Sequence, residues 1–148
     1  MDFLKMTAPC GLDCFNCHFF LAHEDENEMK KVEALAERFN FEADKMLCKG
    51  CRSHDGKIPL QMHIYGEKHF CAAYECIKKK GLDFCYECDD FPCDNLHPYA
   101  DQAEDLPHNY KVFNLCLINK MGLEKWANEK SKDVRNDYYN KPWSLSER

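Results

Sequence analysis

Residues 24–40 repeat apolar and polar side chains with the period of an α-helix. Asp25 is suited to be the N-cap, and Glu28 follows three residues later, as in a capping box. The acidic first turn also suits the helix dipole. The apolar positions fall at steps of three and four: Met29, Val32, Leu35, Ala36 and Phe39. We expect a helix here that packs through this stripe and needs no functional explanation.

Two further helical patterns close the chain. Residues 108–121 predict one helix that ends at Gly122, and residues 123–137 predict a second, joined by so short a turn that the two form a pair. The expected inward positions are Tyr110, Phe113, Leu117 and Met121 on the first helix and Leu123, Trp126, Ala127 and Val134 on the second. The aromatic tail from Tyr138 to Trp143 is expected to break the helix and fold back on the domain.

Between these helices the pattern is irregular. Residues 52–70 predict a loop, because Gly56, Pro59 and Gly66 interrupt any period. Residues 71–80 predict a short helical stretch that stops at Gly81 after three lysines, since basic residues and a terminal glycine favour a helix C-terminus. No stretch alternates as a strand does.

The cysteine content adds information that the pattern of apolar and polar residues does not give. The chain of 148 residues has eleven cysteines, an odd number that complete disulfide pairing does not fit. The first six residues show no basic segment followed by an apolar one, so we expect no secretory signal, and no run reaches the roughly 18 apolar residues of a membrane span. We therefore predict a reduced, cytoplasmic protein whose thiols bind metal.

Ten cysteines form closely spaced groups that are typical of tetrathiolate zinc sites: Cys10, Cys14, Cys17, Cys48, Cys51, Cys71, Cys76, Cys85, Cys88 and Cys93. A Cys-x-x-Cys turn brings two sulfurs to one side of the chain. The prediction is two zinc ions. One is held by Cys14, Cys17, Cys48 and Cys51, with Cys10 competing for a place. The other is held by Cys76, Cys85, Cys88 and Cys93, with Cys71 competing.

The remaining candidate residues have simpler interpretations. Cys116 falls within the apolar helix at 108–121 and is expected to be a buried, inert thiol. Asp13 is expected to accept local backbone N–H bonds. For His54, His63 and His69, exposure or packing is favoured over metal ligation, because thiols are already in surplus.

Two other chemistries stay open. Cys10-x3-Cys14-x2-Cys17 has the thiol spacing of radical S-adenosylmethionine enzymes, but the chain lacks the strand–helix alternation of their barrel, so a bare iron–sulfur cluster is the alternative cofactor. Spare thiols also permit a redox sensor. No catalytic triad, phosphate loop or paired carboxylates at catalytic spacing appear, so a binding protein is favoured over an enzyme.

The net charge of the chain limits the classes of partner that it is expected to bind. A formal net charge of -6 argues against a nucleic-acid surface, and Lys78-Lys79-Lys80 is the one compact basic run. Thiolate ligands would make the protein more negative still. A protein partner, as yet unidentified, is the remaining expectation, with no membrane and no nucleic acid.

The order of the motifs resembles one family. The segments are Ala8-Pro9-Cys10-Gly11-Leu12-Asp13-Cys14-x-x-Cys17, Cys48-Lys49-Gly50-Cys51-Arg52, Cys71-x4-Cys76 and Cys85-x-Glu87-Cys88-x-Asp90-Phe91-Pro92-Cys93. Together they are similar to the bacterial and archaeal domain of unknown function 3795, over residues 7–105. The resemblance implies a small cysteine-rich protein that binds zinc through the ten cysteines. It implies no activity. The chain departs from the expected pattern at Ala72-Ala73-Tyr74-Glu75, where a more basic stretch is expected.

The sequence therefore predicts a small, mainly α protein with irregular zinc-knuckle loops, several helices, a C-terminal helix pair and little or no sheet. It predicts one domain over residues 1–148, with a cysteine-rich part at 7–105 and a helical part at 106–148. The predicted function is a structural zinc-binding module for protein interaction or regulation. The alternative is an iron–sulfur or thiol-based redox protein.

Overall fold

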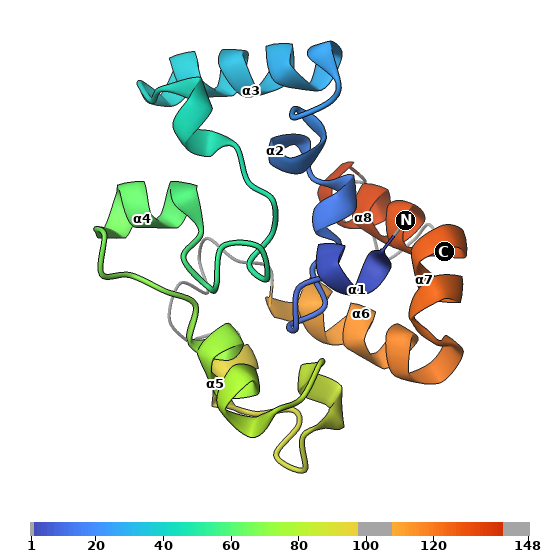
Figure 1. Cartoon of the computed structure of the whole chain (residues 1–148). Coiled ribbons are helices and arrows are strands. Elements are labelled where there is room, and N and C mark those ends of the chain that lie inside the picture. The colour runs from blue at the N-terminus through green and yellow to red at the C-terminus, as the bar shows by residue number, and fades with distance from the viewer. Residues whose placement is uncertain (1, 98–107, 141–148) are drawn as a thin grey trace.

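The computed structural model describes residues 2–97 and 108–140. Within these ranges the chain forms eight α-helices and four short 3-10 helices, and no strand (Figure 1). The prediction of a mainly α fold is confirmed. The single-domain organisation stays a prediction. In chain order the elements are α1 Phe3–Met6, η1 Cys14–Asn16, α2 His18–Leu21, α3 Glu26–Phe39, η2 Ala43–Met46, α4 Pro59–Tyr65, α5 Ala72–Lys80, η3 Cys85–Glu87, η4 Asp94–Leu96, α6 His108–Met121, α7 Leu123–Glu129 and α8 Ser131–Asn140.

The larger hydrophobic core is built around the first cysteine loop. Phe15, in η1, packs edge-on against Trp126 of α7 with ring centroids 5.9 Å apart, and Phe3 of α1 lies 5.1 Å from Phe15. Trp126 of α7 and Leu115 of α6 are fully buried in this core. Because η1 carries Cys14, the same contacts that form the core also fix the position of the first cysteine loop.

A second, smaller core lies under α3, which runs across α2 in Figure 1. The Asp25 side chain caps α3 by accepting hydrogen bonds from the backbone N–H groups of Asn27 and Glu28. Val32, Ala36 and Met46 are buried there. The predicted helix and N-cap are confirmed. Phe39, predicted to face inward, is 55% exposed.

α4 is a helix that the sequence interpretation missed within its predicted loop at 52–70. Pro59 occupies the first turn of α4, where the missing N–H costs nothing, and Gly66 ends it. The prolines and glycines therefore mark the ends of a helix rather than its absence. The predicted helix before Gly81 is confirmed as α5, and Gly81 adopts the left-handed conformation with φ 67°.

The predicted C-terminal pair of helices is divided into three helices, α6, α7 and α8. α6 matches its predicted bounds, but its buried face is formed by Tyr110, Lys111, Asn114, Leu115 and Ile118, while Phe113 is 54% exposed. The predicted second helix divides at Lys130 into α7 and α8. Ser131, which begins α8, is fully buried, and its hydroxyl donates to the Ala127 carbonyl. The hydrogen bond of this buried hydroxyl fixes the backbone at the junction between α7 and α8.

Tyr138 and Tyr139 continue α8 instead of breaking it. Their rings lie 5.2 and 5.8 Å from the ring of Tyr110, so these two residues do fold back on α6. The remainder of the predicted tail, Lys141 to Trp143, lies outside the described residues. Among the described residues, no helix combines the length and apolar character that crossing a membrane requires.

Candidate metal centre

Four thiols line one small hollow. Its volume is about 240 Å³, and the cysteines around it are Cys76, Cys85, Cys88 and Cys93. Cys76 lies on α5, Cys85 begins η3, Cys88 ends it, and Cys93 precedes η4. These are the four residues that the sequence grouped as the second site. Two short 3-10 helices and one α-helix thus place sulfur donors around a common space.

Electrostatics in this hollow reflect the crowding of thiols. Burial raises the pKa of Cys85, and the charges of Cys10 and Cys93 raise it further. Lys80 donates hydrogen bonds to Cys88 Sγ at 2.8 Å and to Asp90 Oδ2 at 2.7 Å. The pKa of Lys80 is raised, first by Asp90 and then by Cys88. Lys80 thus lies against both the sulfur of Cys88 and the carboxylate of Asp90.

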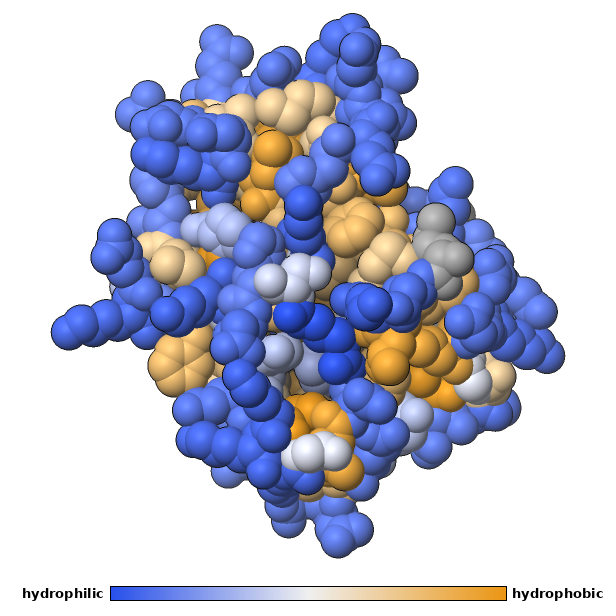
Figure 2. Space-filling model, in the orientation of Figure 1, coloured by the Kyte–Doolittle hydropathy of each residue, from blue (hydrophilic) through white to orange (hydrophobic). Residues whose placement is uncertain are grey.

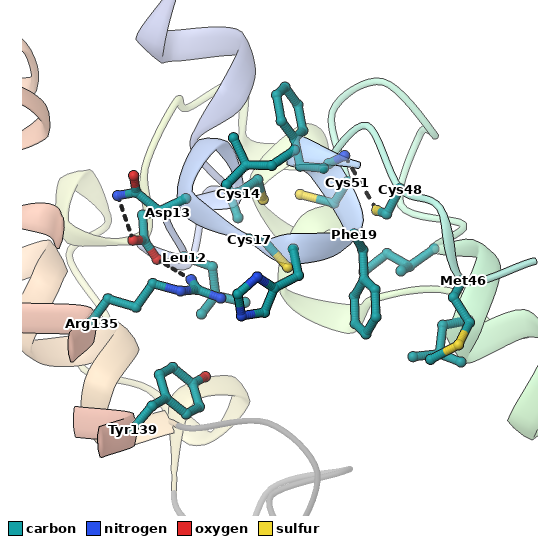
Figure 3. Close-up of a pocket in the computed structure, with 18 of the residues that line it drawn as sticks. Leu12, Asp13, Cys14, Cys17, Phe19, Met46, Cys48, Cys51, Arg135 and Tyr139 are labelled. Carbon is teal, nitrogen blue, oxygen red and sulfur yellow. Dashed lines mark hydrogen bonds and ion pairs between the residues drawn. The ribbon is translucent and has the colours of Figure 1, made fainter. Parts of the chain in front are cut away.

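The other six thiols of the motif line a larger cavity of about 980 Å³: Cys10, Cys14, Cys17, Cys48, Cys51 and Cys71. Figure 3 shows Cys14, Cys17, Cys48 and Cys51 on one side of it, with Asp13, Arg135 and Tyr139 on the other. Cys71, which was predicted to compete for the second site, lines the first cavity, although its charge is among those that raise the pKa of Cys85. Six thiols line the first cavity and four line the second hollow, and which of them would share a metal stays a prediction.

The two Cys-x-x-Cys turns meet directly, although a helix separates them in sequence. A Cβ placed on Gly50 would lie 3.5 Å from both Cβ and Sγ of Cys14. Gly50 has φ 85°, and its N–H donates to Cys48 Sγ at 3.3 Å. The Cys48 N–H in turn donates to the Phe19 carbonyl at 3.0 Å. The pairing of the two turns that the sequence predicted is therefore present in the backbone.

The thiols of this cavity influence one another. Burial raises the pKa of Cys14, and the charges of Cys48, Cys17 and Cys10 add to the effect. Burial likewise raises the pKa of Cys51, followed by the charges of Cys14, Cys10 and Cys71. Thiols that raise one another's pKa in this way stay protonated without a cation, and a cation that binds them must displace the protons.

Arg52 links the two groups of thiols, a role that sequence reasoning missed. Its Nε donates to the Thr7 carbonyl at 2.9 Å, its guanidinium donates to the Asp83 carbonyl at 2.5 Å, and it lies over the Phe84 ring at 5.3 Å. The Cys85 N–H donates to the Pro9 carbonyl at 2.9 Å. The segments before Cys10 and before Cys85 are thereby joined. The signal available in the sequence was an arginine directly after Cys51.

Asp13 anchors the first cysteine loop to the C-terminal helices. Its carboxylate is fully buried and accepts hydrogen bonds from Asn16 at 2.9 Å, Tyr110 at 2.5 Å and Arg135 at 2.8 Å. These donors are side chains, two of them about a hundred residues away in sequence, and not the local backbone groups that were expected. The pKa of Tyr110 is raised, first by burial and then by the charge of Asp13.

The remaining candidates are placed as follows. Cys116 is exposed on α6, so the prediction of a buried thiol is wrong. None of His54, His63 and His69 lines either cavity. His54 accepts the Lys49 N–H at 2.9 Å and so braces the second Cys-x-x-Cys turn. In residues 2–97 and 108–140, no three Cys, His, Asp or Glu side chains already stand in coordinating positions around one point.

The cysteine-rich part of the chain matches one family model. The model is described as "Protein of unknown function (DUF3795)", and it matches residues 6–98. The chain belongs to this family. The DUF3795 match covers all ten cysteines of the two cavities and leaves α6 to α8 outside it, so Asp13 connects the family segment to helices beyond it. Neither the curated proteins nor the solved structures contain a match to this chain.

Proposed function

We propose that this DUF3795 protein binds zinc in sites made of four cysteines and that the metal holds its loops together. The observation that supports this is the hollow bounded by Cys76, Cys85, Cys88 and Cys93, a set of four soft donors from three elements. Cys14, Cys17, Cys48 and Cys51 offer a second such set where the two Cys-x-x-Cys turns meet. Sulfur-only donor sets of this kind suit zinc in a closed, structural site.

Zinc would supply stability that the apolar core does not. Charged residues make up 31% of the chain, above the roughly 25% of typical globular domains, and two cores divide the buried side chains. A structural zinc ion contributes on the order of 10 kcal/mol to folding in small domains. In this chain the metals would fasten the loops that carry the cysteines.

We further propose a role in protein interaction within the cytoplasm. Figure 2 shows apolar side chains exposed among polar ones beneath α3 and beside α2. Among the exposed large apolar residues are Phe39 after the buried stripe of α3, Ile64 on α4 and Phe70 before α5. Exposed aromatic and aliphatic side chains on a scaffold held by metal are typical of binding modules.

The proposed zinc binding is tested by measuring the metal content of the purified protein. The chain is purified without air, and its zinc and iron are measured by mass spectrometry together with a visible absorption spectrum. At least two zinc ions per chain and no visible absorption are the expected result. Iron with sulfide and a broad visible band would overturn the proposal in favour of the iron–sulfur alternative. The matched variants are Cys88→Ser, which should lose one zinc ion, and Cys116→Ser, which should lose none.

A further inference from the structure

The first cavity holds two more thiols than a four-cysteine site uses. If Cys14, Cys17, Cys48 and Cys51 bind one zinc ion, Cys10 and Cys71 remain in the same cavity without an assigned role. Cys10 is 6% exposed, so it is not a surface thiol. The backbone also holds Cys71 in place, since its N–H donates to the Gly56 carbonyl at 3.0 Å and the Gly56 N–H donates to the Cys51 carbonyl at 2.8 Å.

Cys10 lies in the same tight loop that leads to Cys14. The Gly11 N–H donates to the Ala8 carbonyl at 2.9 Å, and the Ala8 N–H donates to the Leu12 carbonyl at 2.9 Å. Cys10 lines the cavity together with Cys14, Cys51 and Cys71.

A buried cation faces the same thiols. Lys111 of α6 lines the cavity and is 3% exposed. No carboxylate among the described residues forms an ion pair with Lys111, whereas Arg135, Lys31 and Lys80 each have one. A buried ammonium without a carboxylate requires another source of negative charge, because burying an unpaired charge is costly. The thiols in this cavity are the groups that can supply it.

We propose that the six cysteines of the first cavity bind a binuclear zinc–thiolate cluster, with Lys111 as its buried counter-charge. Two tetrahedral zinc ions need eight sulfur contacts, and six cysteines provide them when two thiolates bridge both ions. Each thiol releases its proton to solvent as its zinc–sulfur bond forms. Six thiolates and two divalent ions carry a net charge of about -2, which the Lys111 ammonium partly neutralises. The inference rests on the proposed zinc function and extends it from two ions to three.

Zinc stoichiometry tests the cluster. Native mass spectrometry of the zinc-loaded full chain is expected to show about three zinc ions, two in the cluster and one at the second hollow. Cys10→Ser and Cys71→Ser should each lower the count by one, and Cys116→Ser should leave it unchanged. Two zinc ions in the wild type and in both variants would overturn the cluster and leave the proposed function standing. Absence of zinc would overturn both.

Two measurements cover the case in which a cysteine variant fails to fold. Cadmium-113 replaces zinc in the unaltered protein, and two cadmium resonances coupled through bridging sulfur are expected; uncoupled resonances alone would overturn the cluster. Lys111→Met is then compared with Lys120→Met, an exposed lysine of the same helix. Lys111→Met should weaken the affinity for the third zinc ion by about tenfold, the usual effect of removing a group that supports a metal ligand, and Lys120→Met should not. Equal affinities would exclude Lys111 as the counter-charge.

Discussion

Asp13 shows how a single buried charge connects the cysteine loops to the rest of the protein. Its carboxylate is fully buried, and Arg135, whose side chain is 19% exposed, lies 2.8 Å away. A buried carboxylate is tolerated only because Arg135, Tyr110 and Asn16 satisfy it. The sequence placed Asp13 in a loop but gave no indication of these partners, since side-chain pairs across a hundred residues leave no periodic pattern.

Asp13→Asn should destabilise the zinc-loaded protein. The substitution keeps the size of the side chain but removes the charge opposite Arg135, and breaking one side of a buried pair costs about 3 kcal/mol. The free energy of unfolding is measured by denaturant titration, with Asp133→Asn, an exposed acid of α8, as the matched control. An unchanged unfolding midpoint for Asp13→Asn would show that the network contributes nothing.

Gly11 is required for the first cysteine loop to lie against α6. Its φ is 89°, and an added Cβ would lie 2.7 Å from the Lys111 carbonyl oxygen and 2.9 Å from Leu115 Cγ. Gly11→Ala should therefore cost about 3 kcal/mol from a left-handed conformation together with a clash against backbone. Gly81→Ala is the control, because φ is 67° there but no atom lies within 4 Å, so only the conformational cost of about 1 kcal/mol remains. Thermal unfolding measures both, and equal losses would contradict the close approach.

Among the elements, α3 is the one whose N-cap and buried stripe the sequence predicted best, with Phe39 the exception. Both signals are local, since the cap is made by Asp25 to the next turn and the stripe repeats along one helix. α6 was harder, because its buried face includes Lys111 and Asn114. Asn114 is buried because it donates to the Gly11 carbonyl and accepts from Trp126. A hydrophobic pattern cannot identify a face that is buried through polar contacts.

Asp25→Ala should weaken α3 and leave metal binding intact. The side chain caps two backbone N–H groups, so its loss is expected to cost about 1 kcal/mol. Asp25→Ser keeps a capping oxygen and should recover most of that loss. Circular dichroism melting measures the stability, and zinc content should be equal in all three proteins. A fall in zinc content with Asp25→Ala would show that α3 is part of the metal site and not a packed spacer.

At the scale of the whole molecule, the spacing of the cysteines predicted the four thiols that line the second hollow but not all six that line the first cavity. The set of Cys76, Cys85, Cys88 and Cys93 was predicted from spacing, because three of the four lie within nine residues. The sequence did not indicate that Cys71 lines the first cavity, because its backbone is held by Gly56 toward Cys51, and such a contact has no spacing rule. Arg52 and Asp13, which join the segments, could be identified only from the structure.

Removal of metal is expected to unfold the molecule well beyond its loops. The first cysteine loop carries Phe15, which packs on Trp126, and Asp13, which holds Tyr110 and Arg135. If zinc fixes this loop, a chelator withdraws the contacts of α6, α7 and α8 together with the metal. Hydrogen exchange should therefore show loss of protection in α6 as well as in the residues around Cys14, and circular dichroism should show a fall in helical signal.

The control is the same chelator saturated with zinc, which should leave both signals unchanged, and added zinc should restore the chelated protein. An apo protein that keeps its full helical signal and its melting temperature would contradict a structural role for the metal. Loss of protection confined to the cysteine loops, with α6 unaffected, would show instead that the C-terminal helices hold their own core. The two outcomes separate a metal that builds the fold from one that only orders its surface, because α6 to α8 contain no cysteine of either cavity.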